Sequence, residues 1–210
     1  MEITFLGHSS FRLKSKDIIL VTDPFDPKMV GLKYGDAKAD VVTISHDHPD
    51  HNYLKGVSGP VTRGEVFVIN RPGEYEIGGV EVRALSTLGP NLIMVMRIDD
   101  IFVVHSGDLG HVLSEKRVED IGLVDVLLVP VGGGVTLDAK RAAGVIAQLE
   151  PSIVIPMHYS APGLSAEMPK LAGVEDFVKE MGAEAGEKSK KLKVTRDSLP
   201  ENLQVIIMEV

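Results

Sequence analysis

The sequence predicts an α/β (α+β) fold in which two mixed β-sheets pack face to face and helices lie outside them. Three observations support this prediction. Residues up to 104 follow the pattern of successive short strands, whereas later residues alternate between helical and strand patterns. The helices are too few for a doubly wound parallel sheet. Hydrophobic residues make up 44% of the 210 residues, and no low-complexity linker interrupts them, so we expect a single domain over residues 1–210.

The strands of the first half are predicted from alternating or continuous apolar residues bounded by turn residues. The first two segments alternate apolar and polar positions, and the later ones are mostly β-branched runs. Gly7, Pro72-Gly73, Gly78-Gly79, Gly89-Pro90 and Asp99-Asp100 mark turns between them. The predicted strands are residues 2–6, 11–14, 17–21, 41–44, 66–69, 80–85, 92–98 and 101–104.

The second half contains the predicted helices. Residues 114–121 form a short helix with Ser114 as its N-cap. Residues 136–150 have an apolar stripe at helical spacing, and Pro151 ends that helix. Residues 174–181 form a third helix, closed by Gly182. Strands are predicted at residues 124–129, 153–155, 191–195 and 203–209.

Composition narrows the functional classes. The net charge of -8 argues against a large nucleic-acid footprint, which usually needs a basic face. The chain has no cysteine, so disulfides and thiolate metal sites are excluded and any metal must use histidine and carboxylate ligands. No apolar run reaches the ~18–20 residues of a membrane span, and the first residues lack a signal-peptide pattern, so we expect a cytoplasmic protein without a membrane partner. Few asparagines and glutamines and no cysteine indicate a heat-adapted source, a thermophile.

Residues 45–51, Ser-His-Asp-His-Pro-Asp-His, hold three of the seven histidines. If the segment is extended, His46 and His48 point the same way and can chelate one divalent ion. Pro49 then breaks the strand, and Asp50 and His51 beyond the bend can face a second ion. This spacing predicts a metal site rather than a polar loop with incidental histidines.

Further ligands are expected where two later strands end. Asp108 follows the strand at 101–104 in the run His-Ser-Gly-Asp, and His158 follows the strand at 153–155. Side chains of separate strands converge at the carboxyl ends of those strands. A carboxylate can bridge two ions, so Asp108 is the candidate for the shared ligand. The alternatives are a turn aspartate and a core histidine.

These residues together resemble the metallo-β-lactamase superfamily over most of the chain. The subgroup that matches best is the simple hydrolases similar to the ascorbate-phosphate lactonases. The superfamily markers are Asp23-Pro24, His46-x-His48-x-Asp50-His51, Ser106-Gly107-Asp108 and His158. The subgroup markers are Gly7-His8-Ser9-Ser10, Pro72-Gly73-Glu74-Tyr75-Glu76, Val131-Gly132-Gly133-Gly134 and Thr136-Leu137-Asp138.

The resemblance implies a four-layer αββα sandwich with the metal site at one edge of the paired sheets. It also assigns ligands and an orienting residue: His46 and His48 to site one, Asp50, His51 and His158 to site two, Asp108 to both, and Asp23 as a buried orienting residue.

One family histidine of site one is missing, because the sequence after residue 85 reads Ser-Thr-Leu-Gly-Pro. His8 is the candidate replacement. The alternatives are a water in its place, a site in which only site two is well occupied, and a degenerate site.

The predicted activity is that of a metal-dependent hydrolase with one or two divalent ions, in which Asp50 or Asp108 orients a metal-activated hydroxide. His8 or His158 assists the leaving group. By resemblance the substrate is a lactone or ester of a small, optionally phosphorylated molecule. A phosphodiesterase or ribonuclease acting on RNA or cyclic nucleotides is second, and a non-catalytic metal- or ligand-binding member is third. Zinc, manganese, iron and nickel all suit histidine and carboxylate ligands.

Other features are left with two interpretations each. His105 either orients a ligand or is a packed polar residue. His111 either lines the cleft or does not contribute. Residues 136–138 either hold a substrate anion at a helix N-terminus or cap that helix through Thr136 or Asp138. A small-molecule partner is expected, nucleic acid is second, and a homo-oligomer stays open.

Overall fold

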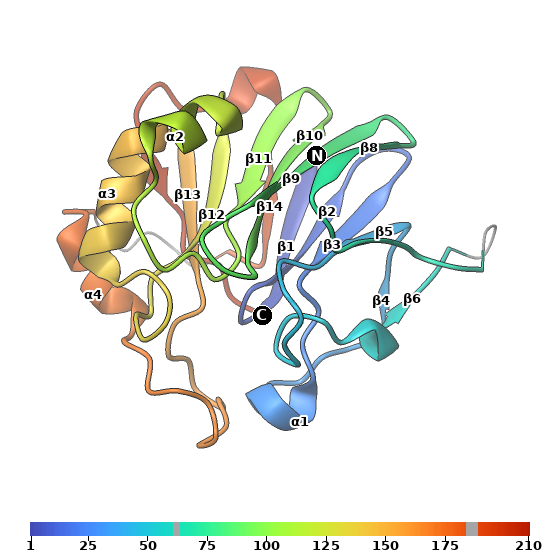
Figure 1. Ribbon diagram of the computed structural model, residues 1–210, viewed down its shortest axis with the longest axis horizontal. Helices are drawn as coiled ribbons and strands as arrows, with labels where there is room; N and C mark the ends of the chain where they lie inside the picture. The colour runs from blue at the N-terminus through green and yellow to red at the C-terminus, as the bar shows by residue number, and fades with distance from the viewer. Residues whose placement is uncertain (61–63, 184–188) are drawn as a thin grey trace.

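The computed structural model describes residues 1–60, 64–183 and 189–210 and shows two large β-sheets that face each other (Figure 1). The strands are β1 (Glu2–Gly7), β2 (Ser10–Lys14), β3 (Ile19–Thr22), β4 (Ala37–Lys38), β5 (Val41–Thr43), β6 (Val57–Ser58), β7 (Phe67–Ile69), β8 (Gly73–Ile77), β9 (Val80–Ser86), β10 (Leu92–Ile98), β11 (Ile101–His105), β12 (Val126–Pro130), β13 (Ile153–Met157), β14 (Lys191–Lys193) and β15 (Gln204–Val205). The helices are α1 (Pro27–Val30), α2 (Glu115–Ile121), α3 (Ala139–Leu149) and α4 (Val174–Glu180), with 3₁₀ turns at Leu54–Gly56 and Arg196–Ser198.

The main core lies between the two sheets. The six-stranded sheet has the order β14-β1-β2-β3-β5-β7, and the seven-stranded sheet has the order β15-β13-β12-β11-β10-β9-β8. In β1 the burial alternates, and Ile3 and Phe5 point into the core between the sheets. In β10, Met94 and Met96 reach this core while the intervening Val95 packs into a second core on the other side. Strands that are buried on both faces read as continuous apolar runs, which explains the sequence pattern of the central strands.

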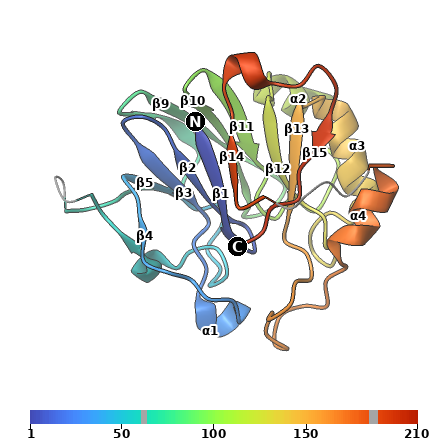
Figure 2. The same ribbon diagram turned by 180° about the vertical axis from the view of Figure 1, so that it is seen from behind.

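Helices α2, α3 and α4 lie on the outer side of the seven-stranded sheet (Figure 2). The predicted helix at 136–150 begins later, at Ala139, because Asp138 is its N-cap and accepts a hydrogen bond from the Arg141 N–H. The predicted cap of α2 is confirmed, since the Ser114 side chain accepts from the Arg117 N–H. Within the described ranges, each helix is too short or too polar to span a lipid bilayer.

The outer side of the six-stranded sheet is covered differently. Val42 and Ile44 pack there against Val57 of the small β4–β6 sheet. We expected helices outside both sheets, but the connection between β3 and β5 contains only the one-turn helix α1, which ends at Gly31 with φ of 86°, and the strand β4. The predicted mixed sandwich is confirmed, with a two-stranded sheet in this outer layer.

The carboxyl ends of several strands meet at one edge of the sandwich. Strands β3, β5 and β7 are parallel, and so are β11, β12 and β13. Strand β1 runs in the same direction as β3 because each is antiparallel to β2. His8, Asp23 and Ser45 therefore follow strands at the edge of one sheet, and Asp108 and His158 follow strands of the other.

Candidate metal centre

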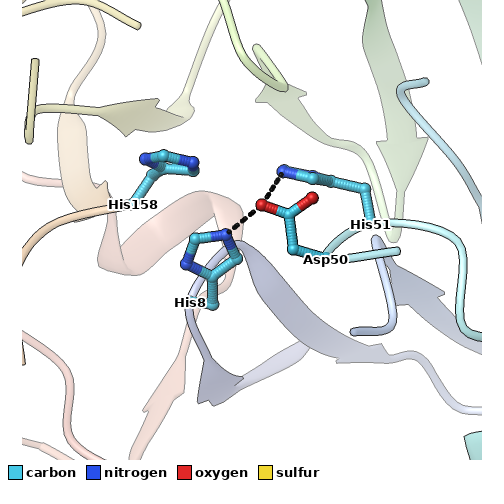
Figure 3. A group of neighbouring side chains, drawn as sticks. All are labelled: His8, Asp50, His51 and His158. Atoms are coloured by element: carbon cyan, nitrogen blue, oxygen red, sulfur yellow. Dashed lines mark hydrogen bonds and ion pairs between the residues drawn. The ribbon is translucent and has the colours of Figure 1, made fainter. Parts of the chain in front are cut away.

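Imidazole and carboxylate groups from both sheets gather at this edge. Figure 3 shows His8, Asp50, His51 and His158, with the carboxylate of Asp50 facing the rings of His8 and His51. Three groups of side chains have ligand atoms within 4.8 Å of one another. They are His8, Asp50, His51 and His158; His46, His48 and Asp50; and His46, His51 and Asp108. All six predicted metal ligands and His8 thus occur in one connected cluster.

Asp108 lies between three histidines. Its carboxylate oxygens lie 3.2 Å from His51 Nε2, 3.5 Å from His158 Nε2 and 3.8 Å from His46 Nε2. These rings come from different segments, so the carboxylate connects the loop after β5 with the loop after β13. This is the geometry expected of a shared ligand, the role that the resemblance implies for Asp108.

Asp23 orients two of the histidines through hydrogen bonds. Its carboxylate accepts the Ser45 N–H at 2.7 Å and the Ser45 Oγ–H at 2.6 Å, and it lies 2.8 Å from His51 Nδ1. The His51 Nδ1–H therefore donates to Asp23, which directs Nε2 toward the cluster. Since Ser45 Oγ donates to Asp23, it accepts from His46 Nδ1 at 3.0 Å. One buried carboxylate thus presents the Nε2 atoms of both rings as ligands.

Two residues that the sequence analysis did not identify or fully interpret hold Asp108 in place. Asn91 accepts the Asp108 N–H at 2.9 Å and donates to the Ser106 carbonyl at 3.0 Å. His105 accepts the Gly107 N–H at 3.1 Å through Nδ1, so its Nε2–H donates to the Ser9 carbonyl at 2.8 Å. The buried His105 ring therefore joins the segment next to His8 to the segment next to Asp108. In the sequence, His105 is marked as a site residue only by its position after an apolar strand. Asn91 is marked only by its position after the turn Gly89-Pro90.

His8 lies with the second group of ligands. Its Nε2 is 3.2 Å from Asp50 Oδ2, and its ring centroid is 4.3 Å from that of His158. The His8 carbonyl accepts the His158 N–H at 3.0 Å, so the two loops are also joined through the backbone. We expected His8 to complete site one with His46 and His48, but the structure places it beside Asp50, His51 and His158 instead.

The backbone of this edge is strained where residues of the site follow their strands. His8, Asp23 and His158 have φ of 53°, 38° and 52°, in the left-handed region that non-glycine residues seldom adopt. Such conformations cost of order 1–3 kcal/mol each and persist where the surrounding structure enforces them, often at functional sites. The hydrogen bond between His8 and His158 is one of the contacts that enforces them here.

The segment at 45–51 is a turn rather than the extended strand that we expected. Strand β5 ends at Thr43, and the His48 N–H donates to the His46 carbonyl while the His51 N–H donates to the His48 carbonyl. The rings of His46 and His48 are nearly parallel, with centroids 6.1 Å apart. His48 is half exposed and contacts the carboxylate of Asp50, so the turn brings Asp50 into the group of His46 and His48 as well.

The charges of the cluster favour a cation. Burial would raise the pKa values of Asp50 and Asp108, but the neighbouring histidines outweigh burial and hold both pKa values well below their ordinary range. Burial lowers the pKa of His158 to about 4 and also lowers the pKa of His8. Burial alone would lower the pKa of His51, but the carboxylates of Asp108 and Asp23 raise it well above its ordinary value. At neutral pH the cluster therefore has anionic carboxylates and favours a positive charge at His51.

Unpaired buried atoms show that these residues fit a metal ion. His51 Nε2 and Asp108 Oδ1 are 3.2 Å apart, yet neither has a hydrogen-bond partner among the described residues. His8 Nδ1 and His158 Nδ1 are likewise buried and without partners within the described ranges. Buried polar atoms are normally paired, and nitrogen and carboxylate donors that converge without hydrogen bonds are suited to a divalent cation.

The remaining candidates lie outside the three groups. His111 Nδ1–H donates to the Val112 carbonyl at 2.9 Å, and His111 lines a surface cavity of ≈ 240 Å³ with Leu88 and Arg117. The loop where the family histidine is missing is exposed at Leu88. At residues 136–138, the carboxylate of Asp138 occupies the helix N-terminus as its cap, which supports the capping interpretation.

Comparisons with known proteins identify the family to which this chain is similar. A family model described as the β-lactamase superfamily domain matches residues 2–158. A UPF0173 protein of Pyrococcus abyssi is 30% identical over 190 residues, covering 78% of this chain and 85% of that protein. A UPF0173 metal-dependent hydrolase of Carboxydothermus hydrogenoformans is 28% identical over 202 residues, covering 80% and 89%. Among solved structures, a proposed Zn-dependent hydrolase of the metallo-β-lactamase superfamily from Thermotoga maritima is 38% identical with a TM-score of 0.83, and the match covers 100% of both chains.

Proposed function

The chain belongs to the metallo-β-lactamase superfamily and is a metal-dependent hydrolase, and we propose that it cleaves a lactone or ester of a small molecule, phosphorylated or not. The observation that supports metal-dependent hydrolysis is the pair of buried atoms His51 Nε2 and Asp108 Oδ1, which lie 3.2 Å apart within the cluster and have no hydrogen-bond partner among the described residues. The finer resemblance to ascorbate-phosphate lactonases supports the lactone class.

The proposed ligands are His46, His48, Asp50, His51, Asp108 and His158, with Asp108 shared. When bound there, one or two divalent ions would lower the pKa of a coordinated water to about 7 and polarise the carbonyl oxygen. Zinc, manganese, iron and nickel suit this donor set, and the Thermotoga maritima neighbour is described as Zn-dependent.

The side chains of the cluster have separate roles. Asp50 stays a carboxylate at neutral pH because its pKa is depressed, so it can accept a hydrogen bond from the attacking water and orient it. Asp108 can do the same from the other side of the cluster. His8 is neutral because burial lowers its pKa, and its Nε2 lies 3.2 Å from Asp50. Its Nε2–H donates to Asp50, so His8 can give that proton to the leaving group while the Asp50 carboxylate takes the proton that leaves the water.

The substrate class is supported by what surrounds the cluster. The three ligand groups consist of histidine and aspartate, and their hydrogen-bond partners within the described ranges include neither lysine nor arginine. Phosphodiester substrates are anionic and are commonly held by such cations, whereas the carbonyl of an ester or lactone is neutral. This favours carbonyl chemistry over cleavage of RNA or cyclic nucleotides.

The test compares hydrolysis of a γ-lactone, a p-nitrophenyl ester and bis-p-nitrophenyl phosphate by the metal-loaded protein. We expect kcat/KM to be highest for the lactone or ester, and Asp108→Ala to lower it by at least about 100-fold. Asp125→Ala, which removes a carboxylate that accepts the Phe102 N–H away from the cluster, is the control. A higher kcat/KM for the phosphodiester would show that the lactone or ester class is wrong. Unchanged activity in Asp108→Ala would show that the cluster is not the site of hydrolysis.

A further inference from the structure

The corner between β9 and β10, residues 87–91, closes on Asn91 through hydrogen bonds. The Asn91 carbonyl accepts the Thr87 N–H at 3.0 Å and the Thr87 Oγ–H at 2.8 Å. Asn91 is buried, with 6% of its surface exposed, although Leu88 in the same corner is exposed. Among the described residues, the ligand groups of the cluster include no member of this corner. The corner therefore holds a buried amide in place without supplying a ligand.

The Asn91 amide binds both ends of the turn that carries Asp108. Its Oδ1 accepts the Asp108 N–H at 2.9 Å, and its Nδ2–H donates to the Ser106 carbonyl at 3.0 Å. Gly107 lies between these two contacts with φ of 55°, and a Cβ at this position would lie 2.2 Å from Asn91 Oδ1. The amide therefore packs directly against the turn and uses its acceptor and a donor there at once.

The backbone next to Asn91 binds a ligand loop of the other sheet. The Leu92 N–H donates to the Ser45 carbonyl at 2.8 Å, and Ser45 Oγ accepts from His46 Nδ1 at 3.0 Å. Ser45 and His46 follow β5 of the six-stranded sheet, whereas Asp108 follows β11 of the seven-stranded sheet. Residues 91–92 therefore connect the two loops that supply His46 Nε2 and Asp108 Oδ2, which lie 3.8 Å apart.

We propose that Asn91 is a positioning residue for metal binding, whose amide fixes the Asp108 carboxylate relative to His46 and acts through Asp108 alone. The inference rests on the proposed metal site and adds a residue that contacts no ion. Gly107 gives the turn a conformational freedom that ion binding would otherwise have to remove. The amide removes this freedom before the ion binds, so the free energy of binding is not reduced by ordering the turn.

The test measures the zinc affinity of the full chain by competition with a chelator. Asn91→Ala should lower the affinity about tenfold, the lower end of the effect seen when a residue that supports a metal ligand is replaced. Gln148→Ala is the matched control, because the Gln148 amide likewise accepts the Leu113 N–H at 3.1 Å and donates to the Leu113 carbonyl at 2.8 Å, away from the cluster. It should bind zinc as the wild type does. Equal zinc affinity in Asn91→Ala and the wild type would overturn the proposal.

A double-mutant cycle with Asp108→Ala separates positioning from a general structural role. When Asp108 is already alanine, adding Asn91→Ala should change the zinc affinity by less than about twofold, because no carboxylate is left to position. The same loss in both backgrounds would overturn the proposal, since Asn91 would then act on the whole edge. Unchanged affinity in Asp108→Ala alone would show that the proposed metal site is wrong, and this inference with it. A loss in Asp108→Ala but not in Asn91→Ala would refute the inference and leave the site intact.

Cadmium NMR then reports the ligands directly, because the ¹¹³Cd chemical shift depends on the oxygen and nitrogen atoms that bind the ion. Asn91→Ala should move the signal in the direction in which Asp108→Ala moves it, and a signal at the wild-type position would overturn the proposal. If Asn91→Ala does not fold, Thr87→Val replaces it, because it keeps the side-chain shape and removes the hydroxyl from the Asn91 carbonyl. It should lower the zinc affinity about threefold, and unchanged affinity would overturn the proposal. These measurements need no turnover, so a wrong substrate class would leave their results intact.

Discussion

Replacing Asp23 by asparagine should weaken metal binding through a change of tautomer at His51. Asp23 accepts three hydrogen bonds, two from Ser45 and one from His51 Nδ1–H. In Asp23→Asn one oxygen becomes an NH₂ group, which cannot accept. If the remaining oxygen keeps the Ser45 N–H, the new amide donates to His51 Nδ1, and the proton of the ring moves to Nε2. That atom is 3.2 Å from Asp108 Oδ1 and is the proposed metal ligand.

The expected loss follows from the type of contact. Substitution of a residue that hydrogen-bonds a metal ligand costs about 10–100-fold in metal affinity, or about 1.4–2.7 kcal/mol. We expect the upper part of this range, because Asp23 serves both His51 and, through Ser45, His46. Asp125→Asn is the control variant. The buried Asp125 carboxylate also has a backbone partner, the Phe102 N–H, and an arginine partner, Arg196, but it lies away from the cluster.

Competition with a chelator measures the zinc and manganese affinities of both variants, and long-range ¹H–¹⁵N NMR spectra of the histidine rings report the tautomer of His51. The wild type should have Nδ1 protonated when metal is bound, and Asp23→Asn should have the proton on Nε2. A folded Asp23→Asn protein that binds metal within twofold of the wild type, with an unchanged His51 tautomer, would refute the reasoning.

Three further outcomes are expected. Metal binding at pH 7 should release about one proton, because the pKa of His51 is raised well above its ordinary value when no cation is bound. Calorimetry in buffers of different ionisation enthalpy measures this proton release, and a release of zero would contradict the prediction. Burial raises the pKa of Tyr34 to about 12, so Tyr34 ionises at lower pH in the unfolded state than in the folded state. Its contribution to the free energy of unfolding is fully present below pH 10 and should fall by about 3 kcal/mol between pH 10 and 12. Tyr34→Phe, compared with the wild type in urea unfolding, should lack this loss. Gly132→Ala should reduce the metal content of the protein, since the new Cβ would lie 2.2 Å from the His158 carbonyl oxygen. The control Gly144→Ala, inside α3, should instead raise the free energy of unfolding by about 0.5–1 kcal/mol. Equal metal content in Gly132→Ala and the wild type would contradict the effect expected at Gly132.

Much of the fold could be predicted because its periodicity is local. The residues of β10 and the cap of α2 follow directly from apolar patterning and from Ser114. Strands β4, β6 and β8 gave weak signals, because Gly73 begins β8 and the other two have two residues each. Pairing with neighbours, which the sequence does not display, stabilises such short strands.

The ligand types could be predicted from spacing, but their grouping could not. The turn at 45–51 depends on hydrogen bonds of His46, His48 and His51, so Asp50 contacts both ends of the cluster. The place of His8 depends on its hydrogen bond to His158, a contact between residues 150 positions apart in the chain. The ligand roles, the single domain, the small-molecule partner, the cytoplasmic location and the thermophilic source stay predictions.

The hydrogen bond between the His8 carbonyl and the His158 N–H has a mechanical consequence. It crosses from the six-stranded sheet to the seven-stranded sheet, as do the contacts of Asp108 with His46 and His51. An ion held by these groups would link the two sheets at this edge of the sandwich and oppose movement of one sheet relative to the other. Removal of the ion by a chelator should therefore increase amide hydrogen exchange at this edge before it increases exchange at the opposite edge.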